Sequence, residues 1–205
     1  MISHRDKFIY TKVGKAGSTS IERCLLAYNR VNVTHCGHYH IQDDINHRTN
    51  NYFKFTFVRN PWSRCVSKYY YMKSKGDELH RAYRKGSFKE FLINANNRFF
   101  IDYPLKKSAP FLNKMRLKFA PHQNQLDWIS DENGNILTDY IGRIENAQED
   151  FNIACDKIGI PRQKLPHTNK SKHKHYTKYY DDEARELVAE LYAKDIEYFG
   201  YEFGE

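Results

Sequence analysis

Several features that would indicate a membrane or secreted protein are missing from the 205-residue sequence. No segment approaches the roughly 20 consecutive apolar residues of a membrane-spanning helix, and the N-terminus lacks the apolar core of a signal peptide. There is no internal repeat. Cysteine is scarce and never occurs with CxxC spacing; the four cysteines are Cys24, Cys36, Cys65 and Cys155. These absences predict a soluble, cytoplasmic protein with reduced thiols.

Basic residues outnumber acidic ones, with 33 Lys and Arg against 25 Asp and Glu, which gives a formal net charge of +8. This balance favours anionic ligands, although net charge says nothing about the fold. The length suits one domain with a hydrophobic core, so we expect a single domain over residues 1–205.

Residues 7–28 have the pattern of a strand, a tight loop and a helix. Residues 8–10 are β-prone, residues 14–20 are small and polar, and apolar residues then recur at helical spacing. Such a loop directs backbone N–H groups and the positive end of the helix dipole at one point, where an anion binds. Lys15 adds a positive charge, and hydroxyl donors come from Ser18, Thr19 and Ser20. This segment therefore predicts a phosphate-binding loop.

Residues 52–73 repeat the pattern, with a strand over residues 52–58 and Pro61 at the first position of a helix. Arg59 follows the strand directly, and its planar guanidinium can hold two phosphate oxygens. Ser67 lies two turns into the helix, where it can bind the same phosphate. Arg64 is a weaker candidate, either for a phosphate contact or for a surface ion pair.

The rest of the chain continues the alternation of strands and helices. We expect a short strand at the start of residues 31–51, a helix at 87–97, a turn at 131–135, a strand at 136–141, a helix from a capping box at Asn146 and Glu149 to Gly159, and a last helix from about Asp181 to Gly200. Parallel strands joined by helices predict an α/β fold of three layers, P-loop-like, with a mainly parallel central sheet flanked by helices.

The two phosphate-binding segments resemble the cofactor motifs of the sulfotransferases, particularly the carbohydrate type called sulfotransferase family 2. The first motif, PKxGSTS, matches residues 14–20, with Gly14 in place of the usual proline. The second motif, RxPxxRxxS, matches residues 59–67. Residues 142–151 and 165–183 also resemble family segments, so the resemblance runs nearly end to end.

This resemblance implies transfer of a sulfuryl group from 3′-phosphoadenylyl sulfate (PAPS) to a hydroxyl, less often an amine, of a carbohydrate or related acceptor. Adenosine 3′,5′-bisphosphate (PAP) is the implied product, and no metal is needed. Arg59 and Ser67 are implied to bind the 3′-phosphate. The 5′-phosphosulfate is implied to bind to Lys15, Ala16, Gly17, Ser18, Thr19 and Ser20. Lys15 is placed to stabilise the leaving phosphate.

A hydroxyl acceptor needs a general base, and histidine titrates in the right range. The resemblance to uronyl 2-O-sulfotransferases, which carry a His-Gly-His segment between the two motifs, favours His38 as the base. Cys36 stands where the first histidine of that segment would be. His122 and a carboxylate elsewhere are the alternatives, and structural roles for His35, His38 and His40 also remain open.

Other interpretations compete with this one. The histidines and Cys36 could bind zinc, but the sequence offers no second pair of ligands for such a site. The basic and aromatic composition of segment 164–178 is also typical of nucleic-acid-binding segments. The family resemblance instead implies that this segment is a loop over the cofactor or acceptor. We therefore expect no nucleic-acid partner. A P-loop kinase using ATP would need the GxxxxGK[ST] spacing, which is absent. A non-catalytic basic module that binds anionic polymers is the remaining alternative. The positive charge favours an acidic acceptor.

Overall fold

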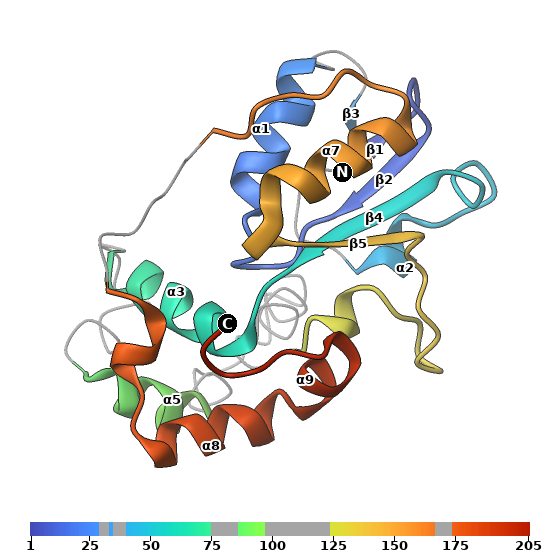
Figure 1. The fold of residues 1–205 in the computed structure, drawn as a ribbon. Coiled ribbons are helices and arrows are strands. Elements are labelled where there is room, and N and C mark those ends of the chain that lie inside the picture. The colour runs from blue at the N-terminus through green and yellow to red at the C-terminus, as the bar shows by residue number, and fades with distance from the viewer. Residues whose placement is uncertain (29–32, 35–39, 75–85, 97–123, 167–173) are drawn as a thin grey trace, which may run out of the picture. The chain divides into compact units, whose positions relative to one another are not determined.

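The computed structural model describes residues 1–28, 33–34, 40–74, 86–96, 124–166 and 174–205 (Figure 1). The chain divides into two compact units. The first unit comprises Met1–Arg59 and Gln125–Lys170, and the second comprises Asn60–Asn124 and Ser171–Glu205. The single domain expected over residues 1–205 stays a prediction.

The first unit contains a five-stranded sheet in the order β3-β1-β2-β4-β5. Its strands are β1 (Ile2–Ser3), β2 (Phe8–Thr11), β3 (Val33–Thr34), β4 (Phe53–Val58) and β5 (Tyr140–Arg143). The three longer strands, β2, β4 and β5, pair in parallel, whereas the two-residue strands β1 and β3 are antiparallel additions. The predicted α/β class and its mainly parallel sheet are therefore confirmed.

Helices alternate with the strands of the first unit in the sequence. They are α1 (Ser18–Tyr28), α2 (Ile41–Asp44) and α7 (Ala147–Ile158), with short 3₁₀ turns η2 (Leu126–Trp128) and η3 (Ile144–Asn146). The prediction of a strand over residues 136–141 is wrong in its start. Ile136 forms only an isolated bridge with Ser130, and β5 begins at Tyr140. The predicted turn is present, since the Asp131 side chain accepts hydrogen bonds from the backbone of Asn133 and Asn135.

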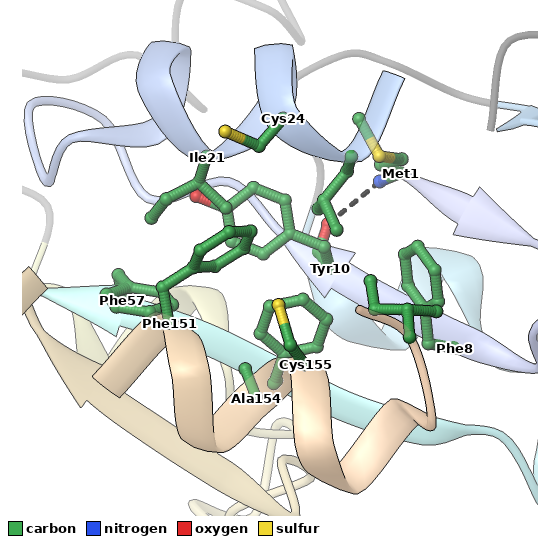
Figure 2. Close-up of a cluster of buried hydrophobic side chains, with 12 residues drawn as sticks. Met1, Phe8, Tyr10, Ile21, Cys24, Phe57, Phe151, Ala154 and Cys155 are labelled. Atoms are coloured by element: carbon green, nitrogen blue, oxygen red, sulfur yellow. Dashed lines mark hydrogen bonds between the residues drawn. The ribbon is translucent and has the colours of Figure 1, made fainter. Parts of the chain in front are cut away.

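The core of the first unit lies on one face of the sheet (Figure 2). Alternate residues of β2 and β4 point into it, and the rings of Tyr10 and Phe55 stack with centroids 5.0 Å apart. Both α1 and α7 bury side chains in this cluster; they are Ile21, Cys24, Leu25, Phe151, Ala154 and Cys155. The amino group of Met1 donates to the carbonyl oxygen of Tyr10 at 2.8 Å (Figure 2). Burial of these aromatic and aliphatic groups holds α1 and α7 against the strands.

The predicted capping box of α7 does not form. Asn146 precedes the helix, but its side chain makes no capping hydrogen bond. Instead, the Asp150 carboxylate accepts from the backbone N–H of Arg143 and from the Tyr140 hydroxyl, which ties the first turn of α7 to β5. The predicted end of the helix is confirmed, since Gly159 adopts φ +80° as a left-handed cap.

The second unit is helical in its described residues. It contains α3 (Pro61–Ser74), α5 (Phe88–Asn96), η4 (Tyr176–Tyr179), α8 (Asp182–Leu191) and α9 (Ala193–Phe199). The single last helix that we predicted is wrong, because the chain breaks at Tyr192, with φ −117° and ψ 25°. The break accompanies burial of the Tyr192 ring, which is 2% exposed and lies 5.7 Å from the guanidinium of Arg64.

Cys24, Cys65 and Cys155 are free and buried, and their reduced state stays a prediction. Burial raises the pKa of Cys65 and of Cys155 to about 11. Cys36 lies outside the described residues. Among the helices that the structure describes, none is both long and apolar enough to cross a membrane.

Candidate functional site

The loop between β2 and α1 has an unusual backbone. Lys15 adopts φ +68° and Gly17 φ +70°, both in the left-handed region. A non-glycine residue there is uncommon and costs conformational energy, and such residues concentrate at ligand-binding sites. Within the loop, the Ala16 N–H donates to the carbonyl oxygen of Val13 at 3.4 Å. The predicted loop therefore exists as a tight turn with Lys15 at its centre.

Gly17 also allows close packing, in addition to its positive φ. A Cβ atom added at this position would lie 2.0 Å from Cδ1 of Ile144, which belongs to η3. The absence of a side chain lets the loop and η3 approach closely. In contrast, a Cβ at Gly14 would meet no atom within 4 Å, so this position is not crowded.

Ser18, Thr19 and Ser20 form the first turn of α1 rather than the loop in which the sequence placed them. The N–H groups of a first helical turn have no partner four residues earlier, so they are directed toward the helix N-terminus. The Ser20 N–H is bonded to the carbonyl oxygen of Gly17 at 3.1 Å. The helix N-terminus and the charge of Lys15 thus belong to one short segment, as an anion site requires.

An ion pair that sequence analysis missed supports the start of the loop. Lys12 and Glu22 lie 2.7 Å apart, and their side chains are only 8% and 17% exposed. Because Lys12 follows β2 and Glu22 lies on α1, the pair joins the two ends of the turn. Nothing in the sequence distinguishes Lys12 from a solvated loop lysine, and only its burial identifies it.

Arg59 lies beside the loop in the first unit. Its Nη1 donates to the carbonyl oxygen of Lys15 at 3.5 Å. Its backbone is held by Gln125, which is fully buried: Oε1 accepts from the Arg59 N–H at 2.9 Å, and Nε2 donates to the Arg59 carbonyl oxygen at 2.8 Å. The structure thus brings the Arg59 guanidinium to the backbone of Lys15, and Gln125 is a supporting residue that sequence analysis missed.

The remainder of the second motif belongs to the second unit. Asn60 caps α3, since its Oδ1 accepts from the N–H groups of Trp62 and Ser63, and its Nδ2 donates to the carbonyl oxygen of Glu202. Trp62 packs, with Nε1 donating to the Arg185 carbonyl oxygen. Ser67 lies two turns into α3, as predicted.

Arg64 is buried in the second unit, at 6% exposure. Its guanidinium lies over the ring of Tyr192. The alternative of a surface ion pair is therefore wrong for this residue, because its charged group is removed from the surface.

The candidate general bases His38 and His122 lie outside the described residues, as do His35 and Cys36, which figure in the zinc alternative. His40 is described: it is half-buried, and its ring stacks on Trp128 at 5.1 Å with an interplanar angle of 17°. This packing favours a structural role for His40. Residues 167–173 of the basic segment also lie outside the described residues.

Comparison with known proteins agrees with this arrangement. The model of the sulfotransferase family matches residues 1–202. The chain belongs to the sulfotransferase family. The match covers both predicted phosphate-binding motifs and nearly all of the sequence, and the resemblance inferred from the motifs is confirmed.

Curated relatives of this sulfotransferase family member include carbohydrate sulfotransferases. The chain is 29% identical to carbohydrate sulfotransferase 14 of Danio rerio over 128 residues, which is 58% of this chain and 34% of that protein. It is 26% identical to human carbohydrate sulfotransferase 9 over 238 aligned residues, covering 98% of this chain and 52% of that protein. An uncharacterized protein of Archaeoglobus fulgidus is 26% identical over 55% of this chain and 72% of its own length.

The chain thus spans a third to a half of the length of the two carbohydrate sulfotransferases that it matches. No solved structure is significantly similar to it.

Proposed function

We propose that this protein transfers a sulfuryl group from PAPS to a hydroxyl group of a carbohydrate or related acceptor. Membership of the sulfotransferase family and the similarity to two carbohydrate sulfotransferases support this class of reaction. The net charge of +8 favours an acidic acceptor. The proposal includes the finer fold assignment, a three-layer P-loop-like arrangement.

The observation that carries the proposal is the approach of Arg59 to the loop of Lys15. Strands β2 and β4 are parallel neighbours, with Thr11 opposite Thr56, and the two cations follow their carboxyl ends. Ligands of open α/β sheets bind outside the carboxyl ends of the strands. The 3.5 Å contact from Arg59 Nη1 to the Lys15 carbonyl oxygen therefore supports a single site for a ligand with more than one anionic group.

The donor set of this site suits such a nucleotide. The turn with Lys15 and Gly17 at positive φ leads directly into the N-terminus of α1, where backbone N–H groups and the hydroxyls of Ser18, Thr19 and Ser20 can donate to phosphate oxygens. We assign the 5′-phosphosulfate to this turn, including Ala16, and the 3′-phosphate to Arg59 and Ser67.

PAPS supplies the sulfuryl group: a bond forms from the acceptor oxygen to sulfur while the bond from sulfur to the 5′-phosphate oxygen breaks, which leaves PAP. Lys15 stabilises the negative charge that develops on the leaving phosphate. His38 accepts the proton of the attacking hydroxyl. None of these roles requires a metal ion.

Calorimetric titration with PAP, beside ATP with magnesium, tests the nucleotide. We expect tight binding of PAP, weak binding of ATP, and weaker PAP binding by the Lys15→Ala variant. Labelled PAPS incubated with a panel of neutral and acidic oligosaccharides then tests transfer, with sulfated product as the expected result. Failure of a folded sample to bind PAP would overturn the proposal. Phosphate transfer from ATP would favour a kinase, and polymer binding without any product would favour a binding module.

A further inference from the structure

The side chain of Gln125 replaces a missing strand neighbour for Arg59. Strand β4 ends at Val58, whose partner on β5 is Arg143, the last residue of that strand. Arg59 therefore lies just beyond the sheet. There the amide group of Gln125 provides both an acceptor, at 2.9 Å from the Arg59 nitrogen, and a donor, at 2.8 Å from the Arg59 oxygen. One side chain thus makes the two bonds that a strand residue would make.

Gln125 is itself firmly placed. It is fully buried and directly precedes η2, where its carbonyl oxygen accepts from the Trp128 N–H at 3.1 Å. Trp128 is 3% exposed and stacks on His40, and Ile129 is fully buried and accepts a bond from the Leu137 N–H at 2.7 Å. The amide of Gln125 therefore belongs to a packed element rather than to a mobile surface side chain.

By holding the Arg59 backbone, Gln125 can fix the direction in which the Arg59 guanidinium points. Arginine recognises phosphate through a planar fork, so its contribution depends on direction as well as charge. The side chain can be aimed only if the backbone that carries it is fixed, and a displacement of about 1 Å in a binding group is enough to reduce activity strongly.

We propose that Gln125 is a positioning residue that acts through Arg59 on recognition of the 3′-phosphate. This inference rests on the proposed function, since it assumes that Arg59 binds that phosphate. In this role Gln125 acts through its two hydrogen bonds to the Arg59 backbone.

The first test is the Gln125→Met variant, which keeps the length of the side chain and removes both hydrogen bonds. We expect PAP to bind about tenfold more weakly, and adenosine 5′-phosphosulfate, which lacks the 3′-phosphate, to bind nearly as well as to the wild type. In the transfer assay, KM for PAPS should rise more than kcat falls, because Lys15 and the loop are untouched.

Thr49→Val is the matched control. Thr49 is buried in the same unit and also bonds the backbone as both acceptor and donor, accepting from the Asn46 N–H at 2.9 Å and donating to the Asp44 carbonyl oxygen at 2.7 Å. Its replacement removes the same kind of bonds outside both motifs. PAP binding should remain at the wild-type level.

A double-mutant cycle separates positioning from a general loss of stability. If Gln125 acts through Arg59, then adding Gln125→Met to Arg59→Ala should weaken PAP binding no further. Independent, additive losses would overturn the proposal.

The outcomes distinguish this inference from the function on which it rests. A wild-type protein that binds no PAP overturns the proposed function. A wild type that binds PAP beside a folded Gln125→Met variant that binds it equally well overturns only the role of Gln125.

Discussion

The two predicted phosphate-binding motifs of this protein follow adjacent parallel strands, yet they are held in place by different means. The loop after β2 is shaped by its own residues: Lys15 and Gly17 have positive φ, and backbone bonds run from Ala16 to Val13 and from Ser20 to Gly17. The residues after β4 depend on distant partners. Arg59 is fixed by Gln125, 66 positions away, and Asn60 binds the carbonyl oxygen of Glu202, 142 positions away.

The first motif therefore depends on local interactions, whereas the second depends on tertiary ones. A turn whose bonds span three residues can form whenever its sequence permits the backbone angles. A motif whose bonds span most of the chain forms only after the fold has brought those segments together, at the cost of closing long loops. The first motif should therefore fail through changes within itself, and the second also through changes far away in sequence.

The largest effect should come from the charge of the first motif. Replacement of Lys15 by Ala should lower kcat by on the order of a hundredfold or more, because a preorganised positive charge no longer meets the leaving phosphate. Initial rates with labelled PAPS measure this. Lys7→Ala is the matched control, since Lys7 is an exposed lysine that also has positive φ, at 50°. Equal turnover of the two variants would contradict the role of Lys15.

The charge of the second motif should affect binding more than turnover. Arg59→Ala should weaken PAP binding by roughly 10- to 100-fold, since hydrogen bonds to charged groups contribute about 1.5–3 kcal/mol. Calorimetry should show a much smaller loss for adenosine 5′-phosphosulfate. Arg162→Ala is the control, because Arg162 pairs with Asp156 on the surface. If Arg59→Ala weakens the binding of both nucleotides equally, Arg59 does not bind the 3′-phosphate.

The shape of the first motif can be tested through stability. Gly17→Ala should lower the free energy of unfolding by about 2 kcal/mol or more, because alanine disfavours positive φ and its Cβ would overlap Ile144. Urea denaturation measures this change. Gly14→Ala, where the added Cβ would meet no atom within 4 Å, should be nearly neutral. If the two variants unfold alike, the close approach of η3 does not constrain the loop.

The smallest effect concerns the helix of the second motif. Asn60→Ala removes the side-chain cap of α3 and should lower the free energy of unfolding by about 1 kcal/mol. Asn60→Asp retains the acceptor for Trp62 and Ser63 but loses the donor to Glu202, so it should cost less. A variant Asn60→Asp as unstable as Asn60→Ala would mean that the distant contact outweighs the cap.

Sequence alone was sufficient for the features that depend on local forces. The two strand-loop-helix segments, the start of α3 at Pro61, and the glycine ends of α7 and α9 all follow from residue periodicity and from backbone preferences of proline and glycine. The candidate residues Lys15 and Arg59 were identified in the same way, and the family match agrees with the motifs that contain them. His38 and the acceptor stay predictions.

Only the tertiary structure decided the features that depend on partners far apart in the chain. The buried Lys12–Glu22 pair, the break at Tyr192 and the late start of β5 have no counterpart in local periodicity. Neither does the clamp of Gln125 on Arg59. A hydrogen bond or an ion pair acts over about 3 Å, and a sequence pattern does not say which distant side chain the fold brings within that distance. Folding places Gln125 against the end of β4, and that placement makes an ordinary glutamine part of a candidate nucleotide site.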